Sequence, residues 1–210
     1  KTIKLELSKG KASINKILCL ASYVPLSNFS WIKKVKFTKR FEKLKKLLID
    51  DDISEKKILL AIPTLKKVKD SISTKVKKQY EVNPYPRWIY ASLNNEDSIS
   101  IYDITKKLQL KVDDKNIKKM KNPKILIAGC GTGRQSIQAA SRYKNSDILA
   151  IDISLKSLSY AKRKSEELGY ENIKYMQADI LDLEKINDKF DIIECTGVLH
   201  HMADPVAGWK

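Results

Sequence analysis

The sequence predicts an α/β fold, a Rossmann-like parallel sheet preceded by an α-helical N-terminal region. Two patterns carry this prediction. After residue 120, short continuous apolar runs, which are typical of strands buried on both faces, alternate with helical patterns. Before residue 120, apolar residues recur at helical spacing between lysines. Because strands that alternate with helices form parallel sheets, we expect a helical, lysine-rich region over residues 1–120 and an α/β domain over residues 121–210.

The α/β part divides into strands and helices with recognisable ends. Ser154 is a typical helix N-cap, Gly169 a typical helix end, and Asp204 precedes a proline suited to a first helical position. The predicted strands cover residues 125–128, 148–151, 173–178 and 190–195, and the predicted helices cover residues 134–143 and 154–168 and start again at residue 205.

The helical region is interrupted by prolines. Its clearest element is an amphipathic helix from Leu65 to Tyr80, whose apolar residues step by three or four positions. It ends before Pro84 and Pro86, since proline breaks the helical hydrogen-bond ladder. The predicted helices cover residues 13–24, 31–48, 54–62, 65–80 and 101–110, and residues 111–122 are expected to form a charged connector.

The composition excludes several classes of protein. With 42% hydrophobic and 31% charged residues, the chain can bury a globular core. Its three cysteines form no CxxC pair, which excludes a disulfide framework or a zinc ribbon and favours a reducing compartment, so we expect a cytoplasmic location. The longest apolar stretch, about ten residues over 17–26, is too short to span a bilayer, and no membrane partner is expected. The two histidines are neighbours, so no metal site is expected.

Positive charge is concentrated in the first part of the chain. The net charge is +16, of which residues 1–120 contribute +15. Such a region can bind nucleic acid or another anionic surface. However, 36 of the 41 basic residues are lysines, whereas nucleic-acid surfaces usually also use arginine for bidentate contacts. Lysine and isoleucine also rise together in A/T-rich coding sequence, so a nucleic-acid partner remains an alternative that we do not favour.

A glycine-rich loop between a predicted strand and a predicted helix marks a ligand site. Gly129, Gly131 and Gly133 allow a ligand to approach the backbone closely. Asp152 follows Gly129 by 23 residues at the end of the next strand, where a carboxylate can accept both hydroxyl protons of a ribose. Asp179 ends the third strand in the same way. Together these residues predict a nucleoside-binding site.

Four motifs carry a resemblance to a known family. The third glycine comes one residue earlier than in the dinucleotide fingerprint, and an arginine stands in its place. The segments ILIAGCGTGR (125–134), ILAIDIS (148–154), QADI (177–180) and FDIIECTGVLHHMADP (190–205) together resemble the class I S-adenosylmethionine-dependent methyltransferases. The resemblance covers about residues 123–210, so residues 121–210 are expected to form the S-adenosylmethionine-binding domain.

This resemblance implies S-adenosylmethionine as the cofactor and assigns contacts to it. Asp152 would hold the ribose, and Asp179 the adenine amino group, with Ile153 and Ile180 against the ring. Glu194 and Arg87 are further candidates for cofactor contacts. The residues that would border the methionine part are Gly129, Cys130, Gly131 and Gly133.

The N-terminal region resembles a second known segment. LCLASYVPLSNF (18–29) and QYEVNPYPRW (79–88) are similar to a segment that precedes this domain in bacterial methyltransferases of mostly unassigned substrate. In that interpretation the segment is a helical cap, and Tyr80, Tyr85, Arg87 and Trp88 line the mouth of the cofactor site. Alternatively, these aromatic residues form a rigid turn that fastens the cap to the α/β domain.

The resemblance also predicts the reaction, methyl transfer to an unidentified acceptor by in-line displacement. Alignment of the nucleophile supplies most of the rate, and a general base is needed only if the acceptor keeps a proton at neutral pH. His200 or His201, just beyond the fourth predicted strand, is the candidate base. The alternative is that this pair only shapes the loop.

Two other functions stay open from the sequence. One is a noncatalytic or nucleic-acid-binding protein with a nucleoside-binding Rossmann-like domain. The other is an NAD(P)-dependent oxidoreductase, for which Tyr160 and Lys164 match a YxxxK pattern, but too early in the chain, so we expect them at the surface. The family's sheet has seven strands and this sequence carries four, so we expect a fragment that is open at both ends.

Overall fold

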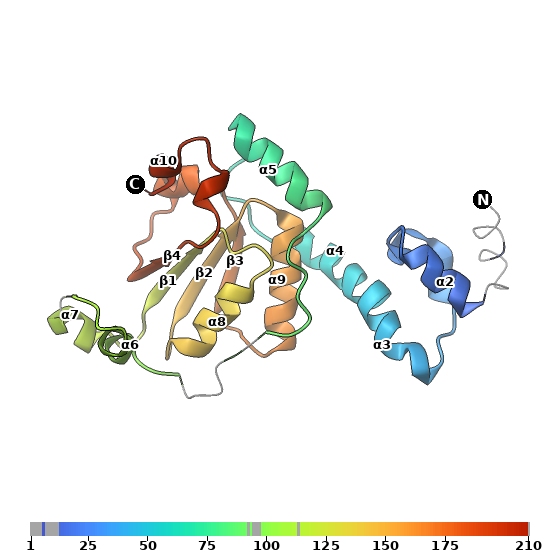
Figure 1. Ribbon diagram of the computed structural model, residues 1–210, viewed down its shortest axis with the longest axis horizontal. Coiled ribbons are helices and arrows are strands. Elements are labelled where there is room, and N and C mark those ends of the chain that lie inside the picture. The colour runs from blue at the N-terminus through green and yellow to red at the C-terminus, as the bar shows by residue number, and fades with distance from the viewer. Residues whose placement is uncertain (1–5, 7–12, 92, 94–97, 113, 210) are drawn as a thin grey trace. The chain divides into compact units, whose positions relative to one another are not determined.

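The computed structural model describes residue 6 and residues 13–91, 93, 98–112 and 114–209. The chain divides into two compact units, Lys1–Lys57 and Ile58–Lys210. The boundary expected near residue 120 therefore falls inside the second unit. Figure 1 shows the elements of both units, and each unit is described separately below.

The first unit is helical and has its own small core. Ile17, Leu26, Ile32 and Ile49 are buried together. The helix predicted over residues 31–48 is wrong in its first half, where 3₁₀ turns cover Ser30–Lys34 and Lys39–Phe41. Extended backbone at the β-branched residues Val35 and Thr38 separates these turns and prevents a continuous helix. The helices of this unit are α2 (Ile14–Ala21), α3 (Glu42–Lys45), a π-helical turn (Lys46–Asp50) and the start of α4 (Asp51–Ala61).

The second unit contains the predicted parallel sheet. In the described part of the chain, four strands pair in the order β3-β2-β1-β4, and every pairing is parallel. The strands are β1 (Lys124–Ala128), β2 (Asp147–Asp152), β3 (Ile173–Gln177) and β4 (Ile192–Glu194), and the helices between them are α8 (Arg134–Arg142) and α9 (Leu155–Glu167). The α/β prediction is confirmed.

The central strands β1 and β2 are buried on both faces, as their continuous apolar runs predicted, whereas Ile193 of the edge strand β4 is exposed. Ile125 and Ile127 of β1 belong to the cluster that includes Ile137 of α8, whereas Leu126 and Ala128 belong to a separate cluster. Alternate residues of one strand therefore enter two different cores. Burial on both faces fixes the register of the strands, and the register fixes where each strand ends.

Helix α5 (Ser71–Val82) begins six residues later than predicted. Its N-cap is Asp70, whose carboxylate accepts a hydrogen bond from the backbone N–H of Ser73 at 2.7 Å. Leu65 lies instead in an extended segment beside β3. There its N–H donates to the carbonyl of Gln177 at 2.9 Å, and the N–H of Gln177 donates to the carbonyl of Pro63 at 2.8 Å.

Among its described residues, the second unit also contains the short helices α6 (Ile101–Lys107), α7 (Asp114–Lys119) and α10 (Pro205–Trp209) and 3₁₀ turns at Ile180–Lys185 and Leu199–His201. Helix α7 lies where a charged connector was predicted. Ile117 and Met120 pack against the main core there, which stabilises a helix that the surrounding lysines did not indicate. The predicted cap of α10 is present, since the N–H of Val206 donates to Asp204 at 2.9 Å. No helix in the described part of the chain has the length and apolar character that crossing a membrane requires.

Candidate active site

A cavity of about 590 Å³ lies in the second unit at the carboxyl ends of the strands. Its walls come from the loops that follow all four strands and from α5. In Figure 1, α5 lies above these strand ends, on the same side as the segment after β4. This end of an open parallel sheet is where ligands bind in such folds, and the volume suits a small molecule or a cofactor.

The glycines of the loop have two different roles, access for a ligand and close packing of helices, and the sequence pattern does not tell which glycine has which role. Gly129 and Gly131 have positive φ angles of 76° and 53° and line the cavity. A Cβ on Gly131 would meet nothing closer than the carbonyl oxygen of Tyr85 at 3.8 Å, so the backbone there is open to a ligand. Gly133, with φ of 82°, is not among the lining residues, and its Cβ would lie 2.5 Å from that of Ala161. Gly133 therefore permits α8 and α9 to pack closely.

Cys130 lines the cavity between Gly129 and Gly131, but its thiol is buried. Burial raises the pKa of this thiol well above its usual value, and the nearby charge of Asp152 raises it further. Cys130 is therefore a neutral, uncharged part of the wall at physiological pH.

Asp152 ends β2, and backbone groups hold its carboxylate toward the glycine loop. One oxygen accepts from the N–H of Gly131 at 2.8 Å, and the other accepts from the N–H of Ser154 at 2.9 Å. Burial raises the pKa of Asp152, while these backbone hydrogen bonds oppose that rise, and the charge of Glu81 adds to it. An ionised carboxylate has about four acceptor sites, so the group can still accept a hydroxyl proton from a ligand.

Asp179 ends β3 and stands beside an apolar slot. It is 7% exposed, and one carboxylate oxygen accepts from the N–H of Leu181 at 3.1 Å. Ile153, Ala178 and Ile180 line the cavity next to it. A carboxylate beside flat apolar walls can bind a planar ring that carries a hydrogen-bond donor.

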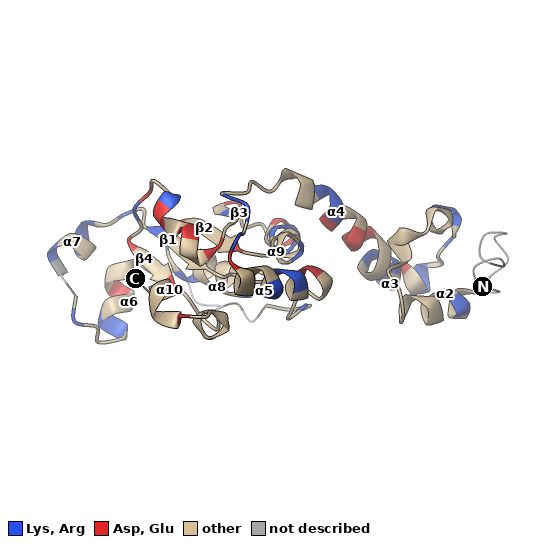
Figure 2. Cartoon of the chain, turned by 90° about the horizontal axis from the view of Figure 1, so that it is seen from above, with Lys and Arg blue, Asp and Glu red and all other residues tan. Residues whose placement is uncertain are grey.

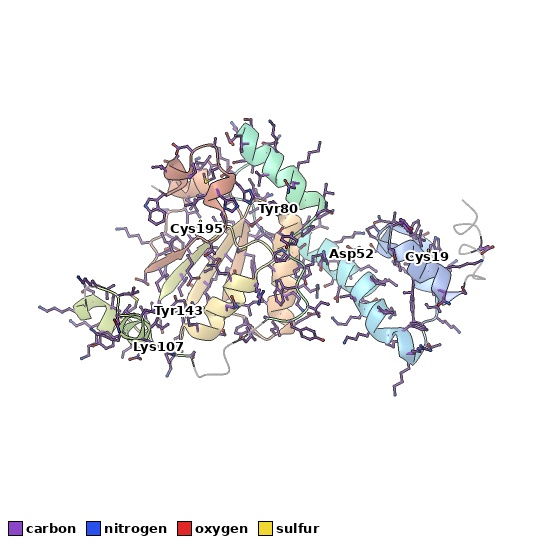
Figure 3. All side chains as sticks on the ribbon, viewed as in Figure 1. Cys19, Asp52, Tyr80, Lys107, Tyr143 and Cys195 are labelled. Carbon is purple, nitrogen blue, oxygen red and sulfur yellow. The ribbon has the colours of Figure 1, made fainter. Side chains whose placement is uncertain are left out.

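The two histidines occupy different positions. His201 lines the cavity, and its Nε2 lies 3.4 Å from the hydroxyl of Tyr80 on α5. Tyr80 belongs to α5 and contacts the segment that follows β4; it is labelled in Figure 3. His200 is not among the lining residues, although its ring centroid is 4.0 Å from that of His201. The structure therefore brings only His201 of the pair to the cavity.

The aromatic segment after α5 has features of both predicted roles, since one residue lines the cavity and another fastens the segment to the α/β domain. Tyr85 lines the cavity. Trp88 is buried and fastens the segment to the glycine loop, since its indole N–H donates to the carbonyl of Thr132 at 3.0 Å. Tyr160, expected at the surface, is in fact 4% exposed, and its hydroxyl donates to the carbonyl of Trp88. Arg87 lies over the Tyr160 ring, 4.5 Å from its centroid, and does not line the cavity.

Glu194 also lies outside the cavity lining. Its oxygens accept from the side-chain nitrogen of Gln135 at 2.9 Å and from the hydroxyl of Tyr143 at 3.0 Å. Figure 3 shows Tyr143 near the opposite end of α8 from the cavity. Glu194 therefore contacts a residue that lines the cavity, Gln135.

Sequence reasoning missed two residues that shape the site. Glu81, near the end of α5, accepts from the N–H of Leu155 at 2.8 Å and so caps the start of α9. Gln135 lines the cavity from the first turn of α8. Glu81 carries no local signal, because its partner is 74 residues away in the chain. Among the described residues, no group of three or more His, Cys, Asp or Glu side chains could hold a metal ion.

Comparison with known proteins finds a methyltransferase domain within the second unit. The family model described as a methyltransferase domain matches residues 119–208. Over 87 residues, 41% of this chain and 21% of the relative, the chain is 39% identical to an uncharacterized protein of Synechococcus sp.. Over 77 residues, 37% of this chain and 27% of the relative, it is 39% identical to the release factor glutamine methyltransferase of Flavobacterium psychrophilum.

Among solved structures, a magnesium protoporphyrin IX methyltransferase from Synechocystis PCC 6803 with bound SAM is similar at 23% identity. That match covers 69% of this chain and 71% of that chain, with a TM-score of 0.45. The chain spans less than a third of the length of the first curated relatives that it matches. Residues 119–208 match a methyltransferase domain, in agreement with the resemblance of the sequence to the class I S-adenosylmethionine-dependent methyltransferases, and the cofactor that this match implies is S-adenosylmethionine.

Proposed function

We propose that this chain transfers a methyl group from S-adenosylmethionine to an acceptor that carries an exchangeable proton. The observation that carries the proposal is the cavity in which Asp152, Asp179 and the backbone of Gly129 and Gly131 meet. Two carboxylates at successive strand ends suit the two polar parts of a nucleoside, the ribose and the base. A cavity of about 590 Å³ is large enough to hold such a ligand beside a small acceptor.

The residues present fit the cofactor of the family. Asp152 would accept from the ribose hydroxyls, and Asp179 from the adenine amino group. Ile153 and Ile180 would contact the adenine ring, and the Gly131 backbone would lie against the amino-acid part. When bound, S-adenosylmethionine supplies a methyl group that its sulfonium already activates.

The chain's own contribution is to align the acceptor, to exclude water and to take up a proton. Helix α5 closes the cavity above the strand ends with Ser73, Val76 and Tyr80. His201 faces this wall, and an imidazole is suited to accept a proton near neutral pH. We propose His201 as the base, with the hydroxyl of Tyr80 as its hydrogen-bond partner. His200, which lies outside the cavity, would then only support the loop.

A binding measurement tests the cofactor. Calorimetric titration of the folded chain with S-adenosylhomocysteine and with NAD should show binding of the first ligand only. The glycine spacing and the carboxylate pair supply no site for a second nucleotide, which is the physical reason for that selectivity. Binding of NAD in preference to S-adenosylhomocysteine would support an oxidoreductase instead and would contradict the proposal.

A turnover measurement tests the role of His201. Radiolabelled methyl transfer should be followed with low-molecular-mass and macromolecular extracts offered separately as acceptor sources. His201→Asn should lower turnover by roughly 10²–10⁴-fold, because a positioned base contributes about that factor. His200→Asn is the matched control and should retain most of the activity. Equal losses in the two variants would show that the pair only shapes the loop.

A further inference from the structure

Glu194 and its neighbours hold one cavity residue, Gln135, in a single orientation. The Nε2 of Gln135 donates to Oε2 of Glu194 at 2.9 Å and to the hydroxyl oxygen of Thr196 at 3.1 Å. The other carboxylate oxygen, Oε1, accepts from Tyr143 at 3.0 Å and lies 4.0 Å from the guanidinium of Arg142. Every contact of this carboxylate is thus with a donor.

The chemistry of the carboxylate fixes which way the amide points. An ionised carboxylate only accepts hydrogen bonds, so the NH₂ group of Gln135, and not its carbonyl oxygen, must face Glu194. Tyr143 supports this arrangement. Burial and then the charge of Glu194 raise the pKa of Tyr143, so that its hydroxyl keeps its proton and donates. The polar atom of Gln135 that remains for a ligand is therefore Oε1, a pure acceptor.

The strand order tells which part of the cofactor reaches this acceptor. Asp179 follows β3 and Asp152 follows β2, and the sheet continues in the order β1 and then β4. A nucleoside held by these two carboxylates therefore directs its 5′ substituent toward β1 and β4. Gln135 and Thr196 line the cavity at that end. In S-adenosylmethionine the 5′ substituent ends in an amino acid, whose ammonium group carries three donors.

We infer that Glu194 is a positioning residue that acts through Gln135. It orients the Gln135 carbonyl oxygen to accept from the ammonium group of the cofactor, and so favours ligands with an amino-acid end over the bare nucleoside. This inference rests on the proposed function. It also explains how Glu194 can matter for the cofactor without lining the cavity.

Two ligands that share a nucleoside test the inference. S-adenosylhomocysteine carries the amino-acid end, whereas 5′-methylthioadenosine lacks it. We expect Glu194→Gln to weaken S-adenosylhomocysteine binding about tenfold, because the new amide no longer forces one orientation on Gln135. Binding of 5′-methylthioadenosine should stay within twofold of the wild type, and it serves as the internal control for a folded site.

Gln135→Met provides a second variant in case Glu194→Gln does not fold. It keeps the length of the side chain, removes Oε1, and should cause the same selective loss. The double variant should lose no more than either single variant, because both changes remove one interaction.

The outcomes separate this inference from the proposed function. Unchanged S-adenosylhomocysteine affinity in both single variants would overturn the inference, and so would an equal loss for both ligands, which is what a purely structural role of Glu194 predicts. A folded wild-type chain that binds neither ligand would contradict the proposed function itself, and the inference with it.

Discussion

The two walls of the cavity are built in different ways. One wall is formed by the loops that follow the strands, where Asp152 and Asp179 take their positions from adjacent buried strands. The other wall is α5, of which no residue is fully buried, and which carries Tyr80 toward His201. The sheet fixes the positions of the groups on the first wall, and these positions can be predicted from the sequence. The second is held by a few side-chain contacts between distant segments, so it is both harder to predict and easier to open.

The difference between the two walls also corresponds to two tasks, binding of a nucleoside and access of an acceptor. The groups suited to a nucleoside lie on the first wall, and α5 contributes Tyr80, the hydrogen-bond partner of His201. Ligand contacts on rigid elements preserve their geometry, while access to a cavity requires an element of lower stability. Basic residues in Figure 2 lie on α5, α6 and α7 alike, so charge alone marks neither wall.

The largest effect on stability is expected within the glycine loop. Gly133→Ala should destabilise the chain by roughly 3 kcal/mol, because the new Cβ would collide with Ala161 and the φ angle is left-handed. Gly131→Ala should cost only about 1 kcal/mol, since its Cβ has room. Urea unfolding of both variants checks the difference. Equal losses would show that Gly133 has no special packing role.

A smaller loss of stability is expected at Trp88, which attaches the aromatic segment after α5 to the glycine loop. Trp88→Phe removes the donor to the buried carbonyl of Thr132 and leaves a void, so it should cost about 2 kcal/mol. Tyr85→Phe is the matched control, because Tyr85 is 74% exposed, and it should change stability by less than about 0.5 kcal/mol. Thermal unfolding distinguishes the two variants, and similar losses would place the attachment elsewhere.

Helix α5 should open locally when its attachment to α9 is removed. Glu81→Ala deletes the cap on the N–H groups of Leu155 and Lys156 and should lower the free energy of local opening by about 1 kcal/mol. Hydrogen exchange should then become faster in α5 while β1 and β2 stay protected. Faster exchange across the whole sheet would mean that the two walls unfold together.

The smallest expected effect is the change of stability with pH that the ionisation of Asp152 causes. Burial raises the folded-state pKa of Asp152 above its ordinary value of 3.8. Its favourable contribution to stability is therefore complete below that value and is lost as the pH rises through the folded-state pKa. Asp152→Asn cannot ionise, so it should gain stability relative to the wild type between about pH 4 and pH 7. Urea midpoints at both pH values check this, and a relative gain by the wild type would contradict it.

The strands and the groups at their ends could be predicted because each depends on neighbouring residues. The apolar run 125–128 predicted β1, and Ser154 predicted the start of α9, where it accepts from the N–H of Ser157 at 3.1 Å. The methyltransferase resemblance predicted over about residues 123–210 is confirmed by the family model, which matches residues 119–208. The assignment of individual residues to the cofactor and the expected boundary near residue 120 remain predictions.

The parts of the fold and of the site that could not be predicted depend on contacts between distant segments, which local sequence patterns do not encode. Tyr80 and His201 are 121 positions apart, and their contact exists only because α5 folds over the strand ends. Helical periodicity placed the start of α5 at Leu65, but pairing with Gln177 draws that residue into an extended segment. Glu194 contacts Gln135 of α8 and Tyr143 just after α8, which are 59 and 51 positions away in the chain, so no local pattern indicates these contacts.

The central claim is that the loops after the strands, and not α5, hold the nucleoside. Its most direct test compares one variant in a strand-end loop with one variant in α5. S-adenosylhomocysteine affinity should be measured by calorimetry for the wild type, Asp152→Ala and Tyr80→Phe. We expect Asp152→Ala to weaken binding by about 100-fold or more, because two hydrogen bonds to a charged group are lost, and Tyr80→Phe to change it by less than about threefold. A loss in Tyr80→Phe as large as that in Asp152→Ala, or unchanged binding in Asp152→Ala, would contradict the account.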